Sequence, residues 1–106
     1  MTEYTFQRIK QSIASDRVWK NGLYASFGAL ADPTRYSIFQ TLVIHKGFCV
    51  SDLAELVGVS VASASQHLKF LEKQRLVVRE RKGRKICYKV NYHNDITILF
   101  IQMINV

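Results

Sequence analysis

Residues 50–77 read VSDLAELVGVSVASASQHLKFLEKQRLV, and this stretch decides the fold of the chain. Its beginning predicts a short helix, because three apolar residues recur at helical spacing and are expected to face inward: Leu53, Leu56 and Val57. Ser51 is a suitable N-cap for this helix. Gly58 follows the last apolar residue and suits a turn with positive φ, which glycine adopts without steric cost. The pattern therefore predicts a short helix that ends in a tight turn.

The rest of the stretch predicts a second helix with two unlike faces. Ser60 is its expected N-cap, and three small or apolar residues at i, i+4 and i+7 are expected to face the core: Ala64, Leu68 and Leu71. The residues expected to point mostly outward are Ser63, Ser65, Gln66 and Lys69. Small polar residues are poor choices inside a helix, so their presence indicates that another molecule approaches this face. Helix, glycine turn and helix together form a helix-turn-helix pattern.

The period of the sequence changes after this unit. Residues 76–90 read LVVRERKGRKICYKV and alternate between the two faces of a strand. Two strands flank Lys82-Gly83-Arg84, which predicts a β-hairpin with an almost entirely cationic tip. A helix-turn-helix followed by a basic hairpin is the winged form of the motif. The predicted fold is therefore mainly α with a small β-hairpin, a winged helix-turn-helix of about five helices and a two-stranded wing.

Further helices are predicted before this unit. Residues 5–31 carry apolar side chains at helical spacing and predict one long helix or two joined helices, loosened near residues 21–22. Asp32 suits an N-cap, and Pro33 suits the first position of the next helix, which is expected to stop near Gly47.

The last helix is predicted to be apolar on almost every side. Asn94 or Asp95 is its expected cap, and its apolar residues recur at helical spacing: Ile96, Leu99, Phe100, Met103 and Ile104. A small monomer has little interior in which to bury such a helix, so a partner subunit is its expected cover. We therefore expect one domain, residues 1–106, that forms a homodimer through terminal helices at about residues 3–31 and 94–106.

The net charge of +7 is concentrated in one segment. Residues 66–89 hold nine lysines and arginines and two glutamates, whereas the basic and acidic residues elsewhere cancel. A local basic stretch is typical of a surface that binds a polyanion, and a solvated charged face is the alternative. The polar face of the second helix favours the first interpretation.

These features together predict a surface that binds double-stranded DNA. The major groove admits one α-helix, and a glutamine such as Gln66 can pair with an adenine through two hydrogen bonds. Cations of the helix and the hairpin can contact phosphates or enter a minor groove. The predicted DNA-binding residues are Ser60, Ser63, Ser65, Gln66, His67, Lys69, Arg81, Lys82, Arg84 and Lys85. For His67, packing is the alternative to a phosphate contact.

The chain resembles the ArsR/SmtB family of bacterial winged-helix transcriptional regulators in three blocks that occur in order: ALADPTRYSIFQTL, VSDLAELVGVSVASASQHLKFLEKQRLV and RERKGRKICYKV. The resemblance covers roughly residues 30–90. It implies a homodimer whose first and last helices form the interface. It also implies a repressor that binds operator DNA through residues 60–69 in the major groove and usually leaves it on sensing a ligand.

The family's metal sites are incomplete in this sequence. Residues 49–52 read Cys-Val-Ser-Asp where arsenic- and lead-type members carry Cys-Val-Cys-Asp. His93 and Asp95 lie near the start of the last helix, where zinc-type members place ligands, but no second pair follows. Arsenite needs about three thiolates and tight zinc binding about four donors. We therefore expect no metal site and no cofactor, and we expect neither zinc nor arsenite to release the protein from DNA.

Cys49 and Cys87 leave two interpretations open. Each alone is typical of a small buried hydrophobic residue. Together they are candidates for a thiol sensor, although they are far apart in the sequence and two cysteines do not suggest a disulfide framework. A thiol-responsive or metal-responsive repressor is therefore an alternative form of the predicted function.

Other function classes find less support in the sequence. No nucleophile with a base at usable spacing, glycine-rich phosphate loop or carboxylate pair predicts an enzyme. A non-specific architectural nucleic-acid-binding protein would rely on charge and wedge residues, without need of the serine- and glutamine-rich face. The N-terminus lacks the layout of a signal peptide, and no apolar stretch is long enough for a membrane span, so the cytoplasm is the expected location.

Overall fold

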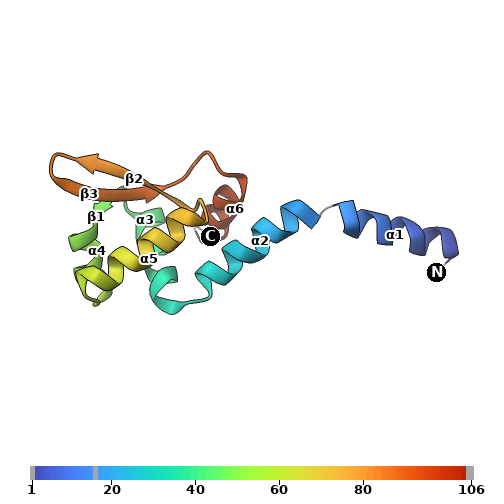
Figure 1. Ribbon diagram of the computed structural model, residues 1–106, viewed down its shortest axis with the longest axis horizontal. Coiled ribbons are helices and arrows are strands. Elements are labelled where there is room, and N and C mark those ends of the chain that lie inside the picture. The colour runs from blue at the N-terminus through green and yellow to red at the C-terminus, as the bar shows by residue number, and fades with distance from the viewer. Residues whose placement is uncertain (1, 16, 105–106) are drawn as a thin grey trace.

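A computed structural model describes residues 2–15 and 17–104, without the side chains of residues 15 and 17–19. Within these residues six helices and three strands follow one another (Figure 1): α1 (Glu3–Ser15), α2 (Arg17–Leu30), α3 (Pro33–Ile44), β1 (Phe48–Cys49), α4 (Val50–Val57), α5 (Val61–Lys73), β2 (Val77–Lys82), β3 (Lys85–Val90) and α6 (Asp95–Ile104). This order confirms the predicted winged helix-turn-helix, with α4 and α5 as its two helices and β2 and β3 as its wing. Among the same residues, no helix combines the length and the apolarity needed to cross a bilayer.

The helix-turn-helix forms as its capping residues predict. Gly58 ends α4 at φ 76°, and its N–H donates to the carbonyl of Ala54 (2.9 Å). Ser60 is the N-cap of α5, and its Oγ accepts a hydrogen bond from the N–H of Ser63 (3.0 Å). The residues of α5 that were expected to face the core are fully buried, and they pack with side chains from α3, α4 and the sheet: Ile38, Phe39, Leu42, Leu53, Val77 and Tyr88.

Two details of α4 differ from the prediction. The helix begins at Val50 with Cys49 at the N-cap position, so Ser51 is not the cap. Leu56 is 59% exposed, although it was expected to face inward. The inward side of this short helix is taken by Leu53, Ala54 and the half-buried Val57, which leaves Leu56 outside the core.

The wing is a regular antiparallel hairpin. β2 and β3 pair from Val77 opposite Val90 to Lys82 opposite Lys85. Gly83 is the first residue of the two-residue connection, and its φ of 63° is a conformation that glycine adopts without steric cost. The predicted cationic tip is therefore formed by a tight turn.

A third strand, β1, extends the wing into a sheet of order β1-β3-β2. It pairs antiparallel with β3 and sets Phe48 opposite Tyr88 and Cys49 opposite Cys87. This strand was not predicted, because two residues are too few to show the alternation by which a strand is recognised. It joins the wing directly to the start of α4.

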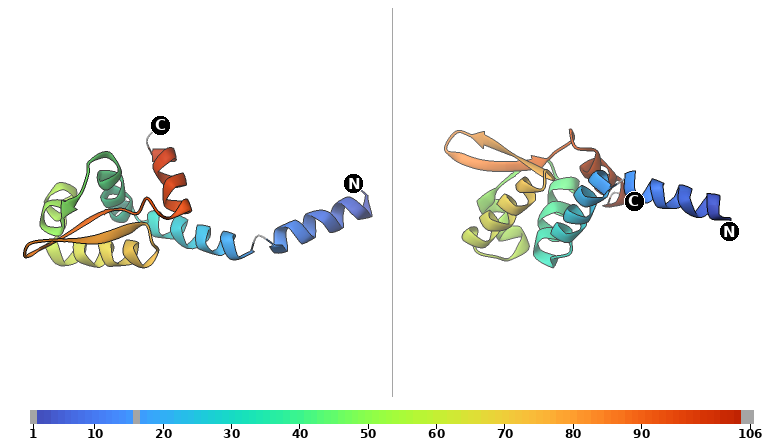
Figure 2. Two further views of the ribbon diagram at one scale, coloured as in Figure 1. Left: turned by 90° about the horizontal axis from the view of Figure 1, so that it is seen from above. Right: turned by 45° about the vertical axis from the view of Figure 1, so that its right-hand side comes forward.

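The N-terminal segment forms two helices, but their boundary differs from the expected one. α1 ends at Ser15 and α2 begins at Arg17, so the helix continues through residues 21–22. Gly22 has a packing role there, because Cδ1 of Ile96 in α6 lies 3.4 Å from the position that a Cβ would take. Figures 1 and 2 show α1 projecting from the body of the molecule, whereas α2 packs against α3 and α6.

α3 begins as the sequence predicts. Asp32 is its N-cap and accepts a hydrogen bond from the N–H of Arg35 (2.9 Å), and Pro33 occupies the first helical position. The helix ends at Ile44, shortly before the expected stop. The start of α3 lies beside α5, the helix that carries the candidate site.

Candidate nucleic-acid interface

The exposed face of α5 carries a line of small and polar residues. Four exposed residues lie at i, i+4, i+7 and i+11, and we term them the outer stripe: Ala62, Gln66, Lys69 and Lys73. Ser63, Ser65 and His67 are half-buried beside this stripe. Gln66 and Lys69 were predicted from the sequence, whereas Ala62 and Lys73 at the two ends of the stripe were missed, although helical spacing from Gln66 leads to both.

The start of α5 is open to a partner at Ser60. This residue is exposed, and its Oγ acts as an acceptor toward Ser63, so the hydroxyl hydrogen can still be donated to another group. The first N–H groups of a helix point outward along its axis and carry partial positive charge. This end of α5 can therefore bind a phosphate.

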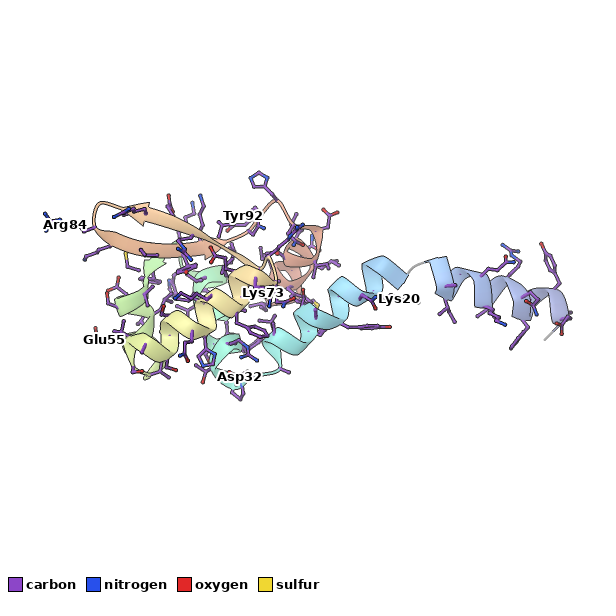
Figure 3. All side chains as sticks on the ribbon, viewed as in Figure 1. Lys20, Asp32, Glu55, Lys73, Arg84 and Tyr92 are labelled. Carbon is purple, nitrogen blue, oxygen red and sulfur yellow. A yellow bond between two sulfur atoms is a disulfide. The ribbon has the colours of Figure 1, made fainter. Side chains whose placement is uncertain are left out.

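The tip of the wing presents four exposed cations: Arg81, Lys82, Arg84 and Lys85. Nε of Arg81 donates to the carbonyl of Gly83 (3.3 Å), which holds this side chain against the turn. Figure 3 shows Arg84 pointing away from the hairpin at the end of the molecule. The wing tip is therefore an exposed cationic surface of the kind that contacts a phosphate backbone.

One cation of the wing is already paired within the chain. Nη2 of Arg79 donates to Oε1 of Glu72 (3.1 Å), and this hydrogen bond is the main reason that the pKa of Arg79 is raised. Glu72 lies on α5 and Arg79 on β2, so the pair helps to orient the wing relative to α5. The charge that the sequence assigns to this segment is therefore not all available to a partner.

Arg35 fixes α5 to the helices behind it. Its Nε donates to the carbonyl of Ala29 in α2 (2.7 Å), and its guanidinium carbon lies 4.3 Å from the ring centroid of Phe70 in α5. A cation–π contact of this kind contributes about 0.5–1 kcal/mol at an exposed site. Arg35 thus joins α2, α3 and α5 at one point.

His67 lies on the side of α5 that faces the start of α3. The pKa of Asp32 is lowered, first by the hydrogen bond from the N–H of Arg35 and further by the positive charges of Arg35 and His67, against an opposing effect of burial. His67 is half-buried. His67 therefore lies near the acidic N-cap of α3, beside the outer stripe.

Cys49 and Cys87 form a disulfide, with a sequence separation of 38 residues. They stand directly opposite each other in β1 and β3. The interpretation of each as an isolated buried thiol is therefore wrong for this structure. The two cysteines did not suggest a disulfide from their number and spacing, yet the structure pairs them. The reason is β1, whose pairing with β3 brings the two residues together. Cys87 is 1% exposed, whereas Cys49 is half-buried.

Metal-ligating side chains are scattered over the molecule. In the part of the chain that the structure describes, no three His, Cys, Asp or Glu residues are grouped so that they could hold a metal ion. His93 and Asp95 border a cavity that Arg75 also lines, and its positive charge disfavours a metal cation there. Both sulfurs belong to the disulfide and do not act as thiolate ligands in this state.

The last helix, α6, begins after Asn94, whose Oδ1 accepts a hydrogen bond from the N–H of Ile96 (2.9 Å), so Asn94 and not Asp95 is its cap.

A large apolar surface is exposed on α1, α2 and α6. A cavity of about 350 Å³ lies between α2, α3 and α6, with Phe27, Phe100 and Met103 in its walls. The exposed apolar residues of the three helices are Tyr4, Phe6, Ile9, Ile13, Tyr24, Phe27, Ile98, Leu99 and Met103. As predicted, one chain leaves part of α6 uncovered: Thr97 and Phe100 are buried, whereas Ile98, Leu99 and Met103 are exposed. Residues 105–106 lie outside the described part.

Comparisons with known proteins agree with this architecture. A family model described as a helix-turn-helix domain matches residues 30–80. The chain is 41% identical over 64 residues to a transcriptional repressor SmtB homolog of Synechocystis sp., a match that covers 60% of this chain and 48% of that protein. It is 37% identical over 67 residues to the transcriptional repressor SdpR of Bacillus subtilis, and this match covers 61% of the chain and 71% of SdpR.

A solved structure shows the same fold. It is the homodimeric winged helix-turn-helix DNA-binding domain of a possible ArsR-family transcriptional regulator from Mycobacterium bovis. The TM-score is 0.73 at 20% sequence identity, over 85% of this chain and 81% of that one. Among the curated relatives, the chain spans about half the length of the SmtB homolog (48%).

Proposed function

The chain belongs to the ArsR/SmtB family of winged helix-turn-helix transcriptional regulators, and from this premise we propose that it is a homodimeric repressor that binds operator DNA. One observation carries the proposal. Three of the four residues of the outer stripe, and the cations of the wing tip, are exposed within residues 66–89, the segment that accounts for the net charge of the chain. In this proposal α5 enters the major groove and the wing lies against the flanking phosphates.

The proposed contacts divide by chemistry. Gln66 on the outer stripe contacts base edges, together with Ser63 and Ser65 at the sides of the stripe, and Lys69 contacts a phosphate. Ser60 and the start of α5 bind a phosphate. The wing cations bind further phosphates and give affinity with little sequence preference.

The proposal is tested by selection from a pool of random duplexes, followed by sequencing of the bound fraction. A homodimer with one recognition helix per subunit should enrich a near-palindromic motif whose half-sites lie about one helical turn of DNA, or a multiple of it, apart. Uniform recovery of all sequences would contradict it and would support a non-specific architectural protein instead.

Replacement of Gln66 by Ala should weaken binding to the selected motif by roughly 1–3 kcal/mol and leave binding to random DNA almost unchanged. The reason is that a bidentate contact to a base edge is lost while the phosphate contacts remain. Titration of both duplexes by fluorescence anisotropy measures the two changes. Gln11→Ala, an identical substitution on the exposed part of α1, is the matched control. Full sequence preference in Gln66→Ala would remove this residue from the recognition surface.

Loss of Arg84 and Lys85 together should weaken binding to every duplex alike. Each phosphate contact releases condensed counterions, so the salt dependence of log Kd should flatten by about one to two units of slope. Titrations across a series of salt concentrations measure this slope. Arg8→Ala with Lys10→Ala removes the same charge from α1 and serves as control. An unchanged slope in the wing variant would place the wing outside the interface.

The remaining parts of the proposal follow from the family. The named relatives are transcriptional regulators, so we propose no enzymatic activity. We place the protein in the cytoplasm, where its DNA target is. For the inducer, the grouping of side chains gives no support to a metal-responsive form within the described residues, whereas the disulfide supports a thiol-responsive form.

A further inference from the structure

The Cys49–Cys87 disulfide joins the two ends of the proposed DNA-binding unit. Cys49 is the N-cap of α4, and Cys87 lies in the middle of β3. The chain between them contains α4, α5, β2 and the wing tip. The cross-link therefore closes the whole recognition unit into one covalent ring.

The inner half of β3 is anchored, because Tyr88 and Val90 are buried in the core, whereas residues 81–86 in the outer part of the wing are all exposed. β1 contributes only two residues, and a two-residue ladder is weak without further support. On the β2 side, the wing continues from α5 and is braced by the exposed ion pair of Arg79 and Glu72, which adds little on its own. The disulfide is thus the strongest link between the wing and the start of α4.

We propose that this disulfide is a regulatory site: it holds the wing cations in position beside α5, and its reduction by a low-molecular-weight thiol loosens the outer part of the wing, residues 81–86, and lowers the affinity for DNA. The inference rests on the proposed function and names its regulation. A surface that is held in its binding geometry loses less conformational freedom on binding, so the oxidised form binds more tightly.

The reaction proceeds by thiol–disulfide exchange. Because Cys87 is buried and Cys49 is half-buried, a thiolate attacks Sγ of Cys49, and Sγ of Cys87 leaves as a thiolate that takes up a proton. A second thiol then attacks the mixed disulfide on Cys49. The two small thiols are oxidised to their own disulfide, and the protein disulfide is reduced to two thiols. Oxidation by a small disulfide reverses the sequence.

The test measures the affinity of both redox forms for a fluorescein-labelled duplex pool of random sequence, since wing contacts do not need a defined operator. Dithiothreitol reduces the protein, and thiol titration should find both cysteines of each chain blocked before and titratable after. We expect Kd to rise about tenfold on reduction. The Cys49→Ala, Cys87→Ala variant should have the affinity of the reduced form whether or not dithiothreitol is present.

A double-mutant cycle locates the effect in the wing. In the Arg84→Ala, Lys85→Ala variant, reduction should change Kd much less, because the contacts that a loosened wing would lose are already absent. Circular dichroism of the same samples should show the same helix content in both redox forms.

Three results would overturn the inference. They are equal affinity of the two redox forms, an undiminished response in the wing variant, and loss of helix on reduction, which would make the disulfide a requirement of the fold as a whole. Absence of DNA binding in both redox forms would contradict the proposed function itself, and this inference with it.

Discussion

Reduction of the Cys49–Cys87 disulfide is expected to lower the free energy of unfolding by about 3–4 kcal/mol. A cross-link stabilises a protein mainly by restricting its unfolded chain, and the effect grows with the length of the closed loop. Here the sequence separation is 38 residues, and the loop contains both helices of the recognition unit. Urea unfolding followed by far-UV circular dichroism should show a lower midpoint for the reduced protein. Both forms are compared at one protein concentration, because the stability of a dimer depends on it.

The matched control is the Cys49→Ala, Cys87→Ala variant. Alanine keeps the buried position of Cys87 apolar, so the variant loses the cross-link without burying a new polar group. Its unfolding midpoint should equal that of the reduced protein and should not respond to dithiothreitol. Equal midpoints for oxidised and reduced wild type would show that the disulfide adds nothing to stability.

The helix-turn-helix and the wing were predictable because their signals are local. Gly58 and Ser60 specify the turn and the next cap within a few residues of chain, and the structure uses both as expected. The change from helical to alternating period marks the hairpin in the same way. Elements whose causes lie within one turn or one hairpin can be derived from a single sequence.

The features that were missed depend on contacts between distant segments. β1 forms because Phe48 and Cys49 pair with β3, and a two-residue strand has no recognisable local sequence pattern. The disulfide depends on that strand pairing, so it could not be predicted from the sequence either. Leu56 fits the helical period but lies outside the core, because among the described residues its side of α4 faces solvent.

The candidate site was predicted only in part, because some of its features are local and others depend on contacts between distant segments. Helical spacing identified Gln66 and Lys69 on the exposed side of α5. The pairing of Arg79 with Glu72 and the proximity of His67 to Asp32 need the packing of α5 against β2 and α3, which the sequence does not show. Charge counted along a chain therefore exceeds the charge that a partner meets.

Replacement of Ile9 by Glu should abolish dimerisation and with it most of the affinity for the selected operator. Ile9 is 45% exposed on α1, in line with Phe6 and Ile13. In a two-fold symmetric interface each substitution occurs twice, so two carboxylates would be buried in an apolar contact. A monomer contacts only one half-site, and we expect the affinity to fall roughly a thousandfold. Sedimentation equilibrium and operator titration measure the two effects.

This variant separates assembly from folding. α1 projects from the body of the molecule, so a change at Ile9 leaves the core around α3, α4 and α5 intact and should leave the circular dichroism of the monomer unchanged (Figure 2). Gln11→Glu introduces the same charge on the opposite side of α1, about 200° around the helix, and should remain dimeric with normal affinity. A monomeric wild type at micromolar concentration, or a fully dimeric Ile9→Glu, would contradict the assignment of α1 to the interface. The apolar surface of α2 and α6 would then need a different cover, because one chain leaves it open to water.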